Sequence, residues 1–188
     1  SSQGLAVDSG GNVYVAGSSD TSWGTPLHEH SGSFGDAFIL KLDTDGAYQW
    51  HTYYGSGYDY IHYNIALDSS DNIYLAGISH DAWGSPLHAH SGNHDLLILK
   101  LNSSGVYHWH TFYGSSNWDF GKTIALDGQG NIYATGSGLA AWGSPLHEHS
   151  GDFDITVLKL NADSLPSCTY SLSATSETFE ASCFTSSV

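Results

Sequence analysis

Hydrophobic and polar residues alternate along this chain in short runs, and the runs recur in the same order three times. In each set a first run ends in a polar turn closed by asparagine, and a second run begins directly after it. These pairs of runs cover 4–8 and 13–17, 64–68 and 73–77, and 123–127 and 132–136. Asp, Gly and Asn favour such turns because they tolerate positive φ or bond the local backbone. Each set therefore predicts a β-hairpin.

Two further runs follow in the first two sets, and one follows in the third. The third run is almost wholly apolar, which is typical of a strand covered on both faces; its copies are 36–42, 95–101 and 154–160. A turn containing glycine leads to a fourth run, rich in aromatic residues and histidine, at 47–54 and 106–113. No segment shows the period of an amphipathic helix. Four short strands per unit are therefore expected.

Four antiparallel strands per repeat are the pattern of a β-propeller blade. We therefore expect an all-β fold of three four-stranded propeller blades. The predicted divisions are blade 1 at 4–63, blade 2 at 64–122, an incomplete blade 3 at 123–161, and a C-terminal tail at 162–188. The third unit lacks its fourth run, which the tail, in the same chain or a neighbour, is expected to supply. Propellers close with about four to eight blades, so three predict an open array or one completed by oligomerisation.

A ten-residue stretch between the second and third runs recurs almost unchanged. It reads WGTPLHEHSG at 23–32, WGSPLHAHSG at 83–92 and WGSPLHEHSG at 142–151. Each copy carries a His-x-His pair: His28 and His30, His88 and His90, His147 and His149. Residues i and i+2 of an extended backbone point the same way, so two imidazoles can share one metal ion. Imidazole ligands without thiolate suit copper, zinc or nickel.

Two imidazoles do not complete a zinc site, which takes three or four protein ligands. The further candidates are Glu29 and Glu148, and in the second copy, where alanine replaces the glutamate, His80 and His94. The alternative is a structural or interface role for the pairs. Other loop positions have diverged between the units while the pairs have not, which argues against passive copying. A copper- or zinc-dependent enzyme is a third alternative.

Other residues admit plainer interpretations. Trp23, Trp83 and Trp142 offer exposed aromatic rings for a glycan or protein ligand, or plug the blades beside Gly and Pro. His51, His108 and His110 of the fourth runs are interpreted as packing between blades. The carboxylates Asp8, Asp68 and Asp127 are interpreted as hairpin-turn residues, and Asp36, Asp95 and Asp154 as residues that fix the turn before the third strand. Calcium is not expected, since no acidic loop ends in the glutamate of an EF-hand.

Charge and composition exclude several function classes. The 188 residues include 19 acidic residues, four lysines and no arginine, for a net charge of −15. Nucleic acid and anionic membrane surfaces are therefore poor partners. No apolar run approaches the ~20 residues of a membrane span. The sequence also lacks a haem-attachment motif, a hydrolase nucleophile elbow and a phosphate-binding loop.

The two cysteines, Cys168 and Cys183, lie in the tail. An even count in an acidic chain rich in Tyr, Ser, Thr and Gly predicts one disulfide, which would clip the tail, and an oxidising compartment. Two free buried thiols are the alternative. The chain contains no methionine, which favours a processed protein whose secretion signal was removed. We therefore expect an extracellular or cell-surface location.

The recurring motifs resemble a known family. The order Ile-Ala-Leu-Asp-x-x-x-Asn-Ile-Tyr-x-x-Gly, Trp-Gly-Ser-Pro, Asp-x-x-x-x-Lys-Leu-Asn and Trp-x-Thr-Tyr-x-Gly is similar to the SBBP-type bacterial β-propeller repeat over residues 4 to about 160. The resemblance implies a propeller fold in secreted or surface proteins and no catalytic residues. The histidine pair is a departure from the family pattern.

These observations together predict a secreted, non-enzymatic structural protein. Its blades would assemble with other copies into an oligomer or an extracellular filament, and the His-x-His pairs would bind copper, zinc or nickel. The alternative is an extracellular module that recognises a glycan or protein through the loop tryptophans. The sequence alone leaves the metal, the number of blades in the assembly and the partner open.

Overall fold

The computed structural model describes residues 1–32, 34–59 and 63–161 and the backbone of 169–172. These residues form twelve strands in three four-stranded sheets and contain no helix. The first sheet comprises β1 (Ser2–Val7), β2 (Val13–Ser19), β3 (Asp36–Leu42) and β4 (Tyr48–Tyr54). The second comprises β5 (Asn64–Leu67), β6 (Ile73–Ser79), β7 (Asp95–Leu101) and β8 (Tyr107–Tyr113). The third comprises β9 (Asp119–Leu126), β10 (Asn131–Gly138), β11 (Asp154–Asn161) and β12 (Thr169–Leu172).

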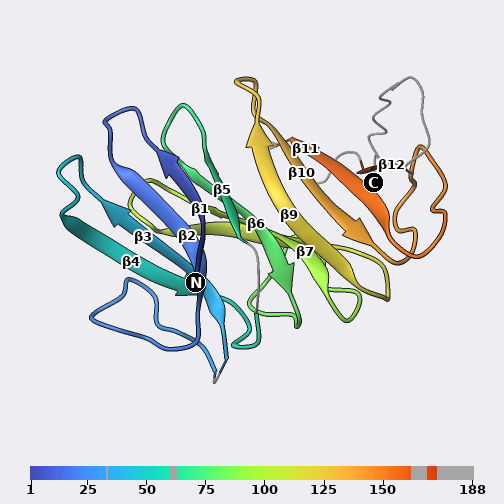
Figure 1. Cartoon of the computed structure of the whole chain (residues 1–188), viewed down its shortest axis with the longest axis horizontal. Helices are drawn as coiled ribbons and strands as arrows, with labels where there is room; N and C mark the ends of the chain where they lie inside the picture. Colours follow the sequence, from blue (N-terminus) through green and yellow to red (C-terminus); the bar gives the residue numbers. More distant parts are fainter. Residues whose placement is uncertain (33, 60–62, 162–168, 173–188) are drawn as a thin grey trace.

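Each sheet is an antiparallel meander whose strands follow one another in chain order. The first strands of the sheets lie next to one another, because β1 contacts β5 and β5 contacts β9. The three sheets stand side by side (Figure 1). Successive sheets packed in this way are blades, so the predictions of an all-β fold and of four-stranded units are confirmed.

The fourth strand of the third sheet comes from the tail of the same chain. The backbone of β12 pairs with β11, and Leu172 lies opposite Ile155, the place that Tyr113 takes opposite Leu96 in the second sheet. The third sheet begins with β9 at Asp119, before the start at 123 expected for this unit. Cys168 and Cys183 lie outside the described residues, so their disulfide stays a prediction.

The apolar core forms two layers, one between each pair of neighbouring sheets. The first layer holds Tyr14 and Ile39 of the first sheet against Leu75 and Leu99 of the second. The second layer packs the opposite face of the second sheet, including Ile98, against the third sheet. Each layer therefore needs side chains from two blades.

Burial differs between the middle sheet and the end sheets. All seven residues of β6 are buried, since both faces of the second sheet are covered. The third runs of the units were expected to be covered on both faces, and this holds only for β7. In β3 and β11 the burial alternates in part, and Ile155 is 50% exposed. The expectation was wrong for the end sheets because one face of each has no neighbouring blade.

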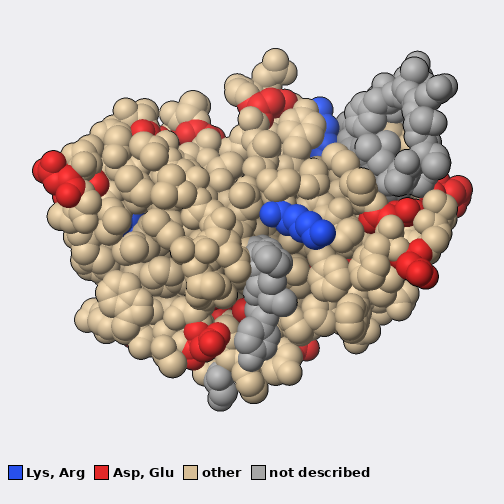
Figure 2. Space-filling model, viewed as in Figure 1, with Lys and Arg blue, Asp and Glu red and all other residues tan. Residues whose placement is uncertain are grey.

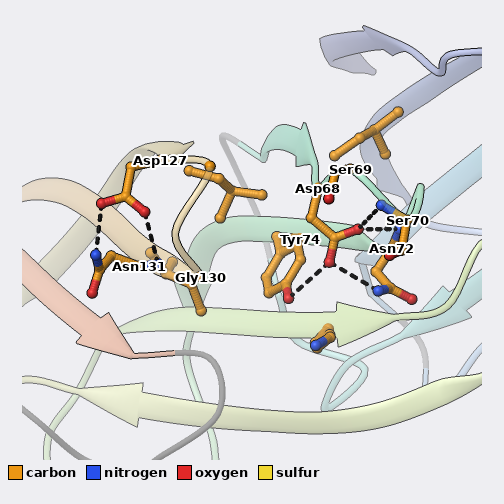
Figure 3. Close-up of a pocket in the computed structure, with 13 residues that line it drawn as sticks. Asp68, Ser69, Ser70, Asn72, Tyr74, Asp127, Gly130 and Asn131 are labelled. Atoms are coloured by element: carbon orange, nitrogen blue, oxygen red, sulfur yellow. Dashed lines mark hydrogen bonds between the residues drawn. The ribbon is translucent and has the colours of Figure 1, made fainter.

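The hairpin turns are held by the aspartate that opens them. In the second sheet, the carboxylate of Asp68 accepts bonds from the Ser70 and Asn72 N–H groups, the Asn72 amide and the Tyr74 hydroxyl (Figure 3). These bonds outweigh the effect of burial and lower the pKa of Asp68. At the equivalent turn, the Asn131 amide lowers the pKa of Asp127 to about 2. The carboxylates therefore serve the turns, as the sequence predicts.

Neighbouring turns are joined at one blade junction and separated at the other. Asp71 accepts bonds from the Ser9 N–H and hydroxyl of the preceding blade, each at 3.3 Å. Its φ of 59° makes it the one non-glycine residue with positive φ among the described residues. At the next junction Gly130 takes the place of Asp71, and a pocket of about 340 Å³ lies between the two turns (Figure 3).

Charged side chains are sparse on the broad face of the molecule. Figure 2 shows that this face is largely uncharged, with acidic residues toward its periphery. Within the described ranges no helix has the length and hydropathy needed to cross a bilayer.

Replacing Asp71 with alanine should destabilise the fold. Alanine retains the unfavourable positive φ and loses both bonds to Ser9, which together should lower the free energy of unfolding by about 1–2 kcal/mol. Asp71→Gly should cost less, because glycine adopts positive φ freely. Urea unfolding followed by tryptophan fluorescence measures both changes. Equal losses in the two variants would show that backbone strain contributes nothing.

Candidate functional site

The first two His-x-His loops lie along the outer strand of their own sheet. In the first sheet, the Leu27 N–H donates to the His51 carbonyl at 2.9 Å, and the Tyr53 N–H donates to the His28 carbonyl at 3.2 Å. The second sheet repeats these bonds from Leu87 to His110 at 3.0 Å and from Phe112 to His88 at 3.2 Å. The loops thus pair with the edges of β4 and β8, which would otherwise present free backbone groups.

The first histidine of each pair anchors the loop to this outer strand. The Nδ1–H of His28 donates to the Tyr53 carbonyl at 2.8 Å, and the ring stacks on Tyr54 with centroids 4.7 Å apart. His88 does the same with the Phe112 carbonyl and the Tyr113 ring. A carbonyl can only accept, so the proton is on Nδ1 in both histidines.

The second histidine fastens the far end of the loop to the second strand. Its Nε2–H donates to the carbonyl of the last residue of that strand in all three units. The pairs are His30 with Ser19 at 2.8 Å, His90 with Ser79 at 3.1 Å, and His149 with Gly138 at 3.2 Å. The pattern of contacts therefore repeats with the sequence.

The two imidazoles of one pair meet different faces of the sheet. The His28 ring stacks on Tyr54, whereas the His30 ring meets Tyr53 edge-on at 5.3 Å. Tyr53 and Tyr54 are consecutive residues of β4, and consecutive strand residues point to opposite faces. The loop is not an extended strand here, so the expectation that the two rings share a face is not met.

The predicted metal ligands are accordingly spread out. Among residues 1–32, 34–59 and 63–161, no three or more His, Cys, Asp or Glu side chains are grouped so as to hold a metal ion. Glu29 and Glu148 are exposed. Binding of copper, zinc or nickel at the pairs stays a prediction, while the observed contacts favour the structural role.

His80 and His94 do come together. Their ring centroids lie 3.7 Å apart, and His94 also lies 5.1 Å from the Trp118 ring. Burial lowers the pKa of both histidines, and the charge of His90 lowers them further. These two histidines belong to the second unit alone, as the sequence indicates.

Two of the loop tryptophans cover the histidines of the fourth strands. Trp83 stacks on His110 at 3.6 Å and 7°, and the Nε2–H of His110 donates to the Trp83 carbonyl at 2.9 Å. The Nδ1 of the same ring accepts from the Tyr107 hydroxyl at 2.8 Å. The first sheet repeats this arrangement with Trp23, His51 and Tyr48. Both histidines are buried and use both ring nitrogens.

Tyrosines connect these local contacts from one blade to the next. Tyr54 of the first sheet stacks with Trp83 of the second at 6.4 Å and 26°. A continuous series of rings therefore crosses the first junction, which is the packing interface between the first and second sheets. The rings are those of His28, Tyr54, Trp83 and His110. At the second junction His88, Tyr113 and Trp142 form the equivalent series. The second loop thus contributes Trp83 to the ring series at the junction before it and His88 to the series at the junction after it.

Trp23 differs from the other two loop tryptophans because no described blade precedes it. Its side chain is 47% exposed, whereas Trp83 and Trp142 are half-buried. Ligand binding through these three tryptophans stays a prediction. Tyr54 and Tyr113, which complete the ring series, were not singled out from the sequence, although both precede Gly-Ser at the end of a fourth run.

The aspartates before the third strands hold the ends of the loops. The carboxylates of Asp36 and Asp95 accept the N–H groups of Ser31 and Ser91 at 2.6 and 2.7 Å. Asp154 accepts the N–H of Ser150 in the same way. This is the turn-fixing role that the sequence predicts.

Sequence comparison agrees with this architecture. The SBBP family model, described as a beta-propeller repeat, matches residues 1–22, 49–81 and 109–140. These three segments are similar to the SBBP-type β-propeller repeat. No curated protein matches it in a sequence comparison. The second and third matched segments run from the outer strand of one blade to the second strand of the next, and so cross a junction between sheets.

The matched segments leave out the His-x-His pairs of all three loops. The matched segments include the tyrosines of the ring series, whereas the third strand of each blade and the histidines that anchor the loops lie outside them.

Replacing His28 with alanine should weaken the first junction. The change removes a side-chain hydrogen bond and a ring stack, together worth about 1–2 kcal/mol of unfolding free energy. Chemical unfolding of the variant and of His108→Ala, an exposed histidine of β8, provides the comparison. The control should change stability by less than about 0.5 kcal/mol. Equal effects of the two substitutions would contradict an anchoring role.

Acidification should destabilise the fold through His110. Burial lowers the pKa of His110 in the folded state, so between this pKa and the unfolded value of about 6.5 the unfolded chain binds more protons. The contribution of His110 is complete above about pH 6.5 and is lost as the pH falls toward the lower folded value. Urea unfolding from pH 8 to 5 measures this slope, and it should be shallower for His110→Gln. An unchanged slope would mean that other groups cause the pH dependence.

Proposed function

We propose that this chain is a non-enzymatic structural propeller module that associates with a second copy through the free faces of its first and third blades. The observation that carries the proposal is the exposure, at both ends, of sheet faces whose counterparts are buried between blades. An extracellular location forms part of the proposal and rests on the acidic, arginine-free composition and the cysteine pair.

The free face of the first blade carries large apolar side chains. Leu5 and Val7 of β1 are 66% and 55% exposed. By the repeat alignment they correspond to Ile65 and Leu67 of β5, and these residues pack in the core layer against the first blade, with Ile65 only 6% exposed. The first blade thus presents the surface that the second blade buries.

The free face of the third blade corresponds to the faces with which the first and second blades pack against the blade that follows them. Ile155 is 50% exposed, whereas the corresponding Ala37 and Leu96 are 0% and 2% exposed and face the following blade. Val157, half-buried, corresponds to Ile39, which is fully buried. The free face of a third blade could therefore pack against the free face of a first blade, as the first blade packs against the second.

This complementarity joins two different faces, so each contact between copies is head-to-tail. Repeat arrays need caps or partners on their end faces, because an uncovered apolar face costs solubility. Closed propellers contain about four to eight blades. With three blades per chain, two copies give six, which lies in this range, while three copies exceed it. A closed pair of chains is therefore favoured over a filament.

A second candidate function is ligand binding at the first blade junction. A cleft of about 600 Å³ lies there, lined by the rings of Tyr54, Trp83 and Tyr107 together with His28 and His108. Aromatic walls with a few polar groups suit a neutral sugar ring, which has both an apolar face and hydroxyl groups. This would be the glycan-binding alternative, with Trp83 as its tryptophan.

Charge on either free face should separate the copies. Leu5→Glu and Ile155→Glu each place an unpaired carboxylate in the proposed contact, which should weaken association at least about tenfold. Light scattering during size-exclusion chromatography should give twice the 20.1 kDa chain mass for the original protein and one chain mass for the variants. Val106→Glu, at a 56% exposed turn position, should remain paired.

A monomer at high concentration would contradict association and would mean that blades of another origin cover the free faces. Long particles in electron micrographs would support end-face association but contradict the closed pair.

A further inference from the structure

Two carboxylates are buried together where the second blade meets the third. Asp95 begins β7 of the second sheet and Asp119 begins β9 of the third, and they are 0% and 2% exposed. The Oδ1 atom of each residue is buried without a hydrogen-bond partner. Such atoms are rare, because an unpaired buried carboxylate oxygen loses its hydration without compensation.

The two side chains converge beside glycines. A methyl group placed on Gly114 would lie 2.4 Å from Oδ1 of Asp95 and 3.0 Å from Oδ2 of Asp119. A methyl group on Gly138 would lie 2.2 Å from Oδ1 of Asp119. Both unpartnered oxygens therefore face positions where the chain has no side chain.

The first junction contains the same pair of acids with their partners in place. Asp36 and Asp59 are both fully buried and converge on Gly55. Oδ1 of Asp36 accepts the Gly57 N–H at 2.9 Å, and Oδ1 of Asp59 accepts the Ser79 hydroxyl at 2.7 Å and the His80 N–H at 3.0 Å. The first junction thus serves as an internal reference.

Two sequence changes remove these donors at the second junction. The segment from Gly114 to Asp119 is one residue longer than that from Gly55 to Asp59, and it provides no donor to Asp95 like the Gly57 N–H. At the position of Ser79 stands Gly138, which has no hydroxyl. The Trp142 indole lowers the pKa of Asp119 slightly, but it does not reach hydrogen-bond geometry with Oδ1 of this residue.

Protein groups do not balance this negative charge. Among the described residues the one ion pair joins Lys41 to Asp8, both in the first blade. Burial raises the pKa of Asp119, and the neighbouring Asp95 raises it further. A proton shared by the two carboxylates would still leave one buried negative charge, whereas a hard divalent cation balances both charges and binds several oxygens at once.

We propose that Asp95 and Asp119 bind a hard divalent cation of the calcium class, which links the second blade to the third. Carboxylate oxygens are the preferred ligands of such ions, and backbone carbonyls and water complete the usual six to eight. The ion would replace the hydrogen bonds that Gly57 and Ser79 supply at the first junction. This proposal does not depend on the association of copies.

Calcium titration of chelator-treated protein tests the site. Calorimetry should find one calcium ion per chain that depends on Asp95. At calcium 100-fold above its Kd, the midpoint of thermal unfolding should rise by about 5–10 °C. Asp95→Asn should abolish the rise, because it removes one charged ligand while keeping the shape of the side chain.

Two further variants distinguish a cation site from general destabilisation. Asp36→Asn makes the same change at the first junction and should retain the calcium-dependent rise. Gly138→Ser should reduce the calcium effect, because its Cβ would lie 2.2 Å from Oδ1 of Asp119 and displace this ligand. Absence of any calcium- or magnesium-dependent shift in the original protein would overturn the proposal, as would a shift that Asp95→Asn retains.

Discussion

The packing of one sheet face against the next blade is the constraint on which this protein depends. A four-stranded sheet of this composition is apolar on both faces, so a blade cannot bury its hydrophobic residues alone. The middle sheet meets this requirement, and β6 is buried along its whole length. The end sheets meet it on one side only, and Leu5 and Ile155 remain exposed on the other. The association proposed above would therefore repeat, across the end faces, the interaction that stabilises the blades inside the chain.

The conserved appearance of the ten-residue loops within this chain follows from how many contacts each loop makes. In the first two loops the tryptophan covers a buried histidine, the first histidine anchors to the outer strand, and the second histidine bonds to the second strand. A change at one position would leave a carbonyl or a ring without its partner. The first two loops share all of these constraints, and the third shares the bond of its second histidine, His149, to the second strand.

Strand order and turn chemistry could be predicted because each depends on local pattern. Asp8, Asp68 and Asp127 hold their turns as the sequence indicates, and the runs of alternating residues became the strands. The ligand geometry of the His-x-His pairs could not be predicted, since it depends on whether the loop backbone is extended. The loss of hydrogen-bond partners at Asp95 and Asp119 could not be predicted either. It depends on a one-residue insertion and on Gly138, which remove the donors to these carboxylates across a blade junction.

The bonds from the loops to β4 and β8 also restrict the direction in which molecules can join. An uncovered outer strand would accept another strand and extend the sheet sideways, as in amyloid-like aggregation. Here the N–H of Leu27 and the carbonyl of His28 already occupy the edge of β4, and Leu87 and His88 occupy that of β8. Lateral growth of the first two sheets is blocked on their outer side. A solution of this protein can therefore become concentrated without its blades recruiting strands from their neighbours there.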